Sequence, residues 1–219
     1  MANKTTTQDA YERIKNMIIN QELLPGNPIV ESNFADEFNI SRTPIRAAIR
    51  LLKEDGLVEL VPNKGTFVKS FTKNDIILCL EMAECLEGMA TYLVAEKYKL
   101  GDLVKSNFNN LKKLEKKMND ALEVSNLSVW SKCDEEFHNQ IIKLCGNYYI
   151  MNEYERVKTH LNCVLWFITP LHIDKRVSTN EHQMIIEAIC EKDPDKARQI
   201  AQIQRNRVRK KFMHLNLMK

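Results

Sequence analysis

The chain has 219 residues and a formal net charge of +3; 44% of its residues are hydrophobic and 28% are charged. This balance is ordinary for a soluble globular protein of one large or two small domains, and no apolar run approaches the roughly 18 residues that a membrane span needs. The polar N-terminus lacks the apolar core of a signal peptide, so we expect a cytoplasmic protein with no membrane partner.

The first third of the chain holds most of its proline and glycine, which predicts short elements joined by turns. An apolar stripe at helical spacing predicts a first helix over residues 7–21, and a second short helix starts near Glu31. After a tight turn, Ser41 suits the N-cap of a third helix that ends near Asp55, and a proline is tolerated in its first turn.

Two short β-type runs follow the third helix. The segments LVELV (57–61) and TFVKSF (66–71) flank the glycine-containing turn PNKG, which predicts a hairpin. The order of helix, helix, tight turn, helix and hairpin is that of a winged helix-turn-helix, which we assign to residues 1–72.

The remainder, residues 73–219, has the pattern of an all-helical bundle. Breaks at glycine, proline and Ser125-Asn126 separate the predicted helices, which cover about 73–98, 102–123, 127–145, 147–168, 177–192 and 194–213. The predicted fold class is therefore mainly α, with an N-terminal winged helix-turn-helix and a C-terminal helical effector-binding and dimerisation domain.

Arg42, Arg46 and Arg50 recur every fourth residue and form one stripe along the third helix, opposite its apolar residues. Arginine suits both bidentate bonds to guanine edges and salt links to phosphates. Ser41 and Thr43 can bond phosphate oxygens at the N-terminal end of this helix. A solvated basic face would give the same stripe, but the turn before it and the hairpin after it favour DNA binding, with Lys64 at the wing tip as a second phosphate contact.

The segment LLPGNPIVESNFADEFNISRTPIRAAIRLLKEDGLVELVPNKGTFV resembles the DNA-binding domain of GntR-type bacterial regulators. The helical remainder is similar to the ligand-binding FCD domain of the FadR branch. The resemblance implies a homodimer on a palindromic operator of double-stranded DNA. It places Ser41, Arg42, Thr43 and Arg46 at bases and phosphates, Lys64-Gly65 in the wing, and Arg50 at a phosphate. Ala47 departs from the family, which commonly has glutamate there.

A second constellation lies in the helical part of the chain. Asp134 and His138 stand four residues apart on one predicted helix, and His182 lies on a later helix among isoleucines. One carboxylate and imidazoles from separate helices can hold a divalent transition metal inside a bundle. A core histidine paired with a carboxylate is the competing interpretation.

The family resemblance implies a metal at this constellation, but the sequence departs from the family pattern at two positions. Many FCD domains bind a metal through an Asp-x-x-x-His pair, a second histidine at the position of His182 and a third about 22 residues on. Here the last position is Gln204, a poorer ligand for zinc-like ions, and Ala83 stands where an arginine is expected. The resemblance implies Zn, Ni or Mn as the cofactor and a small molecule, such as a carboxylate, as the effector; Gln204 and Ala83 would line its pocket. Asp134, His138, His182 and Gln204 could equally line a metal-free pocket.

Three functions compete. The first is a metabolite-responsive transcriptional regulator, in most such families a repressor. The second is a constitutive DNA-binding dimer whose helical domain has lost metal and effector binding. An enzyme is not expected, because the sequence has no nucleophile–base pairing, glycine-rich phosphate loop or metal-site general base. Six scattered cysteines without a C-x-x-C pair are predicted to be reduced, mostly buried thiols.

Overall fold

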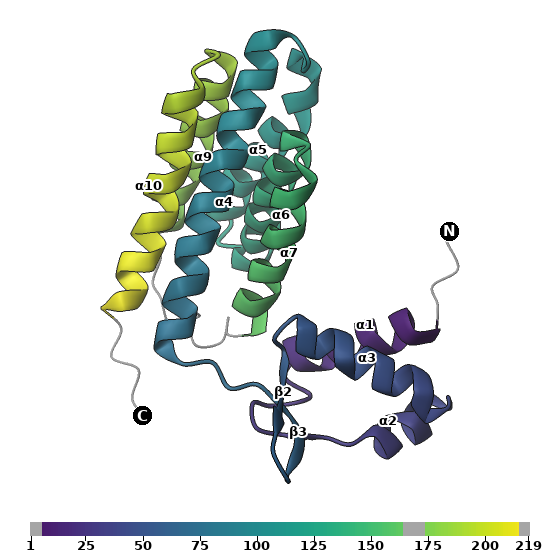
Figure 1. Ribbon diagram of the computed structural model, residues 1–219. Coiled ribbons are helices and arrows are strands. Elements are labelled where there is room, and N and C mark those ends of the chain that lie inside the picture. Colours follow the sequence, from purple (N-terminus) through teal and green to yellow (C-terminus); the bar gives the residue numbers. More distant parts are fainter. Residues whose placement is uncertain (1–5, 164–173, 215–219) are drawn as a thin grey trace. The chain divides into compact units, whose positions relative to one another are not determined.

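The computed structural model describes residues 6–163 and 174–214 (Figure 1). The chain divides into two compact units. The first contains the chain up to Ile76 with the last residues of α7, and the second contains most of the remaining helices. The predicted domain boundary after residue 72 lies where α4 begins, at Lys73. None of the helices described is long and apolar enough to cross a lipid bilayer.

Three helices and a small sheet make up the first unit. The helices are α1 (Thr6–Ile19), α2 (Glu31–Phe38) and α3 (Arg42–Glu54). Apolar residues at helical spacing turn one side of each helix inward, so the helices share one core with the sheet, which includes Ile14, Phe34, Ile45 and Leu52. Asn39 ends α2 in the left-handed conformation, which asparagine tolerates better than most residues, and thereby allows the tight turn into α3.

The sheet has three antiparallel strands in the order β1-β3-β2, namely β1 (Pro28–Ile29), β2 (Val58–Val61) and β3 (Gly65–Val68). Strands β2 and β3 form the predicted hairpin, with Val58 opposite Val68 and Val61 opposite Gly65. Strand β1 was not expected from the sequence, because two residues show no alternation; it is fixed by pairing with β3. The winged helix-turn-helix prediction is confirmed.

The second unit is a bundle of long helices that pack side by side (Figure 1). They are α4 (Lys73–Leu100), α5 (Asn109–Glu123), α6 (Leu127–Cys145), α7 (Tyr148–Cys163), α9 (Lys175–Cys190) and α10 (Pro194–Met213), with a short 3-10 helix (Lys105–Phe108) before α5. Their inward faces form one apolar core around residues such as Phe108, Met118, Phe137 and Ile189. The bundle predicted from the sequence is thus confirmed.

The remaining differences are local. The helix predicted over 102–123 starts at residue 109, after the 3-10 turn, and the last residues of the predicted 147–168 helix lie outside the described part of the chain. All six cysteines are free thiols. Cys133, Cys145 and Cys163 are buried as predicted, but Cys85 is exposed, because it lies on the outer face of α4.

Candidate DNA-binding surface and metal centre

Helix α3 presents two different faces. Ile45, Ala48, Ile49 and Leu52 are buried in the core of the first unit. Ser41, Arg42, Thr43, Arg46 and Arg50, the residues expected to contact DNA, are all exposed. Ser41 is the N-cap, yet its side chain makes no capping hydrogen bond, so its hydroxyl group is available to an outside acceptor or donor. The first turn of α3 therefore combines exposed polar side chains with the backbone N–H groups that attract anions.

Two of the three arginines of the stripe are paired with glutamates, which the spacing of the arginines alone does not indicate. Arg46 forms a forked ion pair with Glu31 of α2, with Nε and Nη2 at 3.0 and 2.9 Å from the carboxylate oxygens. This hydrogen-bonded pair raises the pKa of Arg46 and lowers that of Glu31. Arg50 contacts Glu54 one turn along α3, at 3.2 Å. Within the described chain no carboxylate lies within 4 Å of Arg42. Exposed ion pairs contribute little to stability, so phosphates can compete for these arginines.

The wing is the turn between β2 and β3. Lys64 and Gly65 are exposed there, and the Lys64 N–H donates to the carbonyl oxygen of Val61 at 3.0 Å, which closes the turn. Gly65 has a φ of 110°, a conformation that residues with a side chain rarely adopt. The sequence therefore needs glycine at this point to turn the chain and present Lys64.

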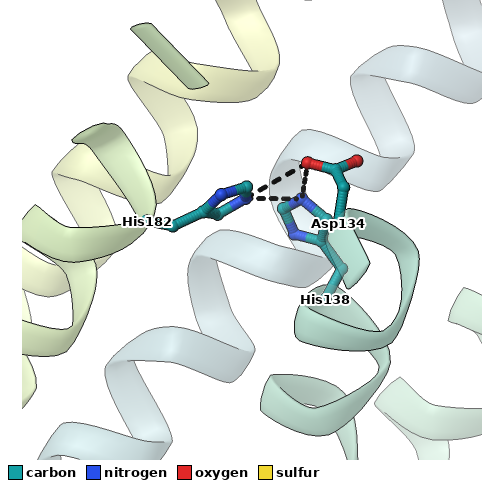
Figure 2. A group of neighbouring side chains, drawn as sticks. All are labelled: Asp134, His138 and His182. Atoms are coloured by element: carbon teal, nitrogen blue, oxygen red, sulfur yellow. Dashed lines mark hydrogen bonds and ion pairs between the residues drawn. The ribbon is translucent and has the colours of Figure 1, made fainter. Parts of the chain in front are cut away.

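Figure 2 shows how three side chains converge inside the helical bundle. Asp134 and His138 lie one turn apart on α6, and His182 reaches toward them from α9. His182 Nε2 is 3.4 Å from Asp134 Oδ1 and 3.3 Å from His138 Nε2, and His138 Nε2 is 3.8 Å from Asp134 Oδ1. One potential ligand atom from each residue thus lies within 4.8 Å of the other two. The structure brings together the three residues that the sequence analysis selected.

Glu87 of α4 fixes the orientation of one of these imidazoles. Its Oε2 lies 3.0 Å from His138 Nδ1 and accepts a hydrogen bond from the Nδ1–H, which leaves Nε2 directed at His182 and Asp134. A second carboxylate that holds the far nitrogen of a ligand histidine is a common feature of metal sites. Glu87 could not be selected from the sequence, because a single glutamate on a long helix carries no spacing signal.

Burial and charge decide the protonation of the two histidines. Burial lowers the pKa of His182 to about 3, so this imidazole is neutral at physiological pH and can act as a ligand. For His138, burial and Arg205 disfavour the charged form, but Glu87 and Asp134 outweigh them and raise its pKa. His182 Nδ1 is buried and has no hydrogen-bond partner in the described chain.

Arg205 of α10 is the second residue that sequence analysis missed. Its Nε and Nη2 lie 2.6 and 2.5 Å from the two oxygens of Glu87, whose side chain is only 4% exposed. The charge of Arg205 and the bond to His138 keep the pKa of Glu87 well below its usual range despite burial. Arg205 could not be selected from the sequence, because its contact with Glu87 joins α10 to α4 across 118 residues of chain.

Gln204 and Ala83 are both buried, as expected of pocket residues. Gln204 Nε2 donates to the carbonyl oxygen of Ser178, one turn before His182 on α9, at 3.3 Å, while its Oε1 has no partner among the described residues. Ala83 lies one turn before Glu87 on α4. A methyl group therefore occupies the position where the family resemblance suggests a guanidinium group.

The architecture defines a class of protein: a winged helix-turn-helix joined to a helical bundle with an internal polar cluster. Residues 6–68 match the bacterial regulatory proteins of the gntR family, and residues 79–203 match the FCD domain. The chain belongs to the GntR family of bacterial transcriptional regulators and carries an FCD domain.

Curated relatives support the family, and a solved structure shares the fold. The HTH-type transcriptional regulator YdhC of Bacillus subtilis is 30% identical over 196 residues, which cover 86% of this chain and 83% of YdhC. A probable D-xylose utilization operon transcriptional repressor of Paenarthrobacter nicotinovorans is 25% identical and covers 89% of this chain and 83% of its own length. Among solved structures, McbR/YncC of E. coli shares the fold with a TM-score of 0.72 at 18% identity, over 94% of this chain and 95% of its own. The two curated relatives are named as transcriptional regulators, and this chain belongs to a family of regulators, not of enzymes.

Proposed function

We propose that the protein is a metabolite-responsive repressor that works in the cytoplasm and binds a palindromic operator as a homodimer. The exposed N-terminal turn of α3 carries this proposal: Ser41, Arg42, Thr43 and Arg46 stand together there, in the position from which a recognition helix reads the major groove. We expect a dimer because one winged helix-turn-helix reads few base pairs, and two-fold symmetry repeats its contacts on a palindrome.

Arg46→Ala tests the recognition helix. If Arg46 exchanges Glu31 for a base edge, specific operator affinity falls by about 1–3 kcal/mol, and discrimination at that base pair relaxes. Lys53→Ala is the matched control, since Lys53 is exposed in the last turn of the same helix and its loss removes the same charge. Gel shifts on the promoter region of its own gene measure both variants. Equal affinities for Arg46→Ala and the unmodified protein would remove Arg46 from the readout.

The polar cluster fits a divalent metal. Asp134, His138 and His182 offer one carboxylate oxygen and two imidazole nitrogens, a donor set that suits Zn, Ni or Mn. Glu87 already holds His138 with Nε2 turned inward, and burial keeps the imidazole of His182 neutral. Three protein ligands leave coordination positions open, and a bound metal would polarise an anionic or carbonyl oxygen of a small effector. Small carboxylates are therefore the first effectors to screen.

Metal content tests this part of the proposal. Protein purified without chelator or affinity tag should carry about one transition-metal ion per chain by elemental mass spectrometry. In Asp134→Ala combined with His182→Ala, both the ion and any metal-induced rise in melting temperature should disappear. An undiminished rise would place the metal elsewhere.

A second candidate function rests on Gln204 and Ala83. Both lack the group that the family resemblance suggests, and the charge of Arg205 is already neutralised by Glu87. These departures favour a constitutive DNA-binding dimer without an effector. Operator release by a small molecule in a gel shift would decide for the ligand-responsive repressor; metal-free protein with no releasing ligand would decide for the constitutive binder.

A further inference from the structure

Helix α7 contributes to two apolar cores. Ile150 and Tyr154, in its first two turns, are buried in the core of the helical bundle. Cys163, its last residue, is buried in the core of the first unit. An α-helix rises about 1.5 Å per residue, so the stretch from Tyr154 to Cys163 spans about 14 Å. One continuous helix therefore connects the helical bundle to the unit that holds α3, in addition to α4.

The last turn of α7 contacts the C-terminal end of the recognition helix. His160 Nε2 lies 2.5 Å from the carbonyl oxygen of Asp55, which is the C-cap of α3. Because a carbonyl oxygen only accepts, Nε2 carries a proton and donates this hydrogen bond. The carbonyl groups at the end of a helix have no partner within the helix and need one from outside. For Asp55 of α3, this partner comes from another helix.

Three neighbours shape this contact. Gly56 leaves room for the imidazole, since a Cβ atom at that position would lie 3.3 Å from His160 Nε2, closer than most side chains approach. The ring of Phe71, in the segment between β3 and α4, packs against the imidazole with 5.4 Å between the ring centroids. Tyr11 of α1 donates to Asp55 Oδ2 at 2.5 Å and so holds the capping residue itself. His160 therefore touches both the end of α3 and the segment that leads into α4.

Further up the same helix, Tyr154 reaches the polar cluster. Its side chain lies next to Glu87, the carboxylate that holds His138. Burial and the negative charge of Glu87 raise the pKa of Tyr154 well above its ordinary value of 10.0, so the phenol keeps its proton and donates a hydrogen bond to Glu87. A change in the position or charge of Glu87 therefore acts directly on α7.

We propose that α7 is a relay and that His160 is the positioning residue at its end: the helix carries a displacement of Tyr154 to the C-terminal turn of α3 and changes how firmly the recognition helix is held. The inference deepens the proposed function and rests on it, because it names a route from the candidate metal centre to the DNA-binding surface. A helix packed in two cores moves as one body, so a change at one core is felt at the other. An effector can use this route only by favouring one of two positions of α7.

The hydrogen bond from His160 is suited to report such a displacement. Helix shifts of about 1–2 Å are typical of switching proteins. A shift of about 1 Å along the bond would lengthen the 2.5 Å contact between His160 and Asp55 beyond the usual range of N–H···O bonds, which weaken steeply with distance and angle. The apolar contacts of Cys163 have no preferred direction and tolerate the same shift.

Hydrogen exchange followed by mass spectrometry tests the contact on the full-length protein without DNA. The reporter is the peptide with the backbone amides of Asp55, Gly56 and Leu57, which donate to carbonyl groups in the last turns of α3. We expect His160→Ala to speed their exchange about 10-fold, as the loss of one hydrogen bond predicts. His160→Gln keeps an N–H donor and should restore most of the protection. His214→Ala removes an exposed histidine at the C-cap of α10 and is the matched control, with unchanged exchange.

Tyr154→Phe tests the transmission along α7. This variant removes only the phenol oxygen that donates to Glu87. It should speed exchange of the same peptide about 3-fold or more in the presence of His160 and leave it unchanged in a His160→Ala background, because two coupled sites do not act additively. Tyr148→Phe is the matched control: Tyr148, in the first turn of the same helix, is 68% exposed and should have no effect in either background. Circular dichroism checks that every variant is folded.

Gel shifts connect the relay to operator binding. His160→Ala and Tyr154→Phe should each lower operator affinity about 5-fold, and the double variant should be weaker than either one by no more than about 2-fold.

The outcomes separate the two proposals. Unchanged exchange in His160→Ala would overturn the contact, and additive effects of the two substitutions would overturn the relay. Faster exchange with unchanged operator affinity would overturn the role of His160 in DNA binding. Failure of the unmodified protein to bind its promoter region would overturn the proposed function, whereas the exchange data would still decide on the relay.

Discussion

At the scale of single residues, Gln204 is the position where the smallest change should have the largest effect. It is buried against the turn of α9 that leads to His182, and its amide oxygen has no partner among the described residues. We expect Gln204→His to raise metal affinity about 10-fold or more, because imidazole is a better ligand than an amide for zinc-like ions. Competition with a chromophoric chelator measures the change.

Gln202→His is the matched control for this substitution. Gln202 lies on the same helix but lines a groove between α4 and α10, so a histidine there should leave metal affinity unchanged. Equal affinity of Gln204→His and the unmodified protein would show that position 204 does not face the ion.

The same scale shows what a sequence can predict about a site. Asp134, His138 and His182 could be selected because their residue types and one helical spacing indicate metal chemistry. Glu87, Arg205 and the Arg46–Glu31 pair could not, because each joins residues from different elements and depends on how those elements pack. Pairwise contacts across 15 or 118 residues of chain leave no local pattern.

At the scale of elements, the start of α4 depends on a capping box. The Thr72 N–H donates to Asp75 Oδ2 at 2.8 Å, and the Asp75 N–H donates to Thr72 Oγ1 at 3.1 Å. We expect Thr72→Ala to lower the free energy of unfolding by about 1 kcal/mol. Thr72→Ser keeps the hydroxyl group and should retain most of this stabilisation. Urea denaturation followed by circular dichroism measures both, and equal midpoints for Thr72→Ala and the unmodified protein would contradict the role of the cap.

This cap also predicts a pH dependence. The hydrogen bonds from Thr72 lower the pKa of Asp75 below its ordinary value of 3.8. The carboxylate therefore stabilises the fold fully above pH 3.8, and its contribution is lost as the pH falls through the lowered pKa. The difference in free energy of unfolding between Asp75→Asn and the unmodified protein, measured by urea denaturation at a series of pH values, should therefore shrink as the pH falls below 3.8.

The ends of an element could be predicted from the sequence where a capping residue marks them. Helices α6 and α10 were predicted with the observed bounds, because Asn126 and Asp193 accept capping bonds there. Strand β1 was missed because it exists only through its pairing with β3.

At the scale of the whole molecule, the salt dependence of operator binding should report how many winged helix-turn-helix domains contact DNA. Each phosphate neutralised adds about 0.9 to the slope of log affinity against log salt. A homodimer presents each phosphate contact twice, so we expect Lys64→Ala to reduce the slope by about 1.8, which is twice 0.9. Fluorescence anisotropy over a series of salt concentrations measures the slope, with Lys53→Ala as the control. A reduction of about 0.9 would mean that only one winged helix-turn-helix binds the operator.

Helix α4 starts within the first unit, at Lys73, and continues without a break into the helical bundle. About four turns later it carries Glu87, which holds His138 of the candidate metal centre. A change at the metal centre therefore acts on the same continuous helix that leaves the winged helix-turn-helix. Substitutions along these turns are expected to alter ligand response and operator binding together, whereas substitutions of the exposed lysines of α5 should alter neither.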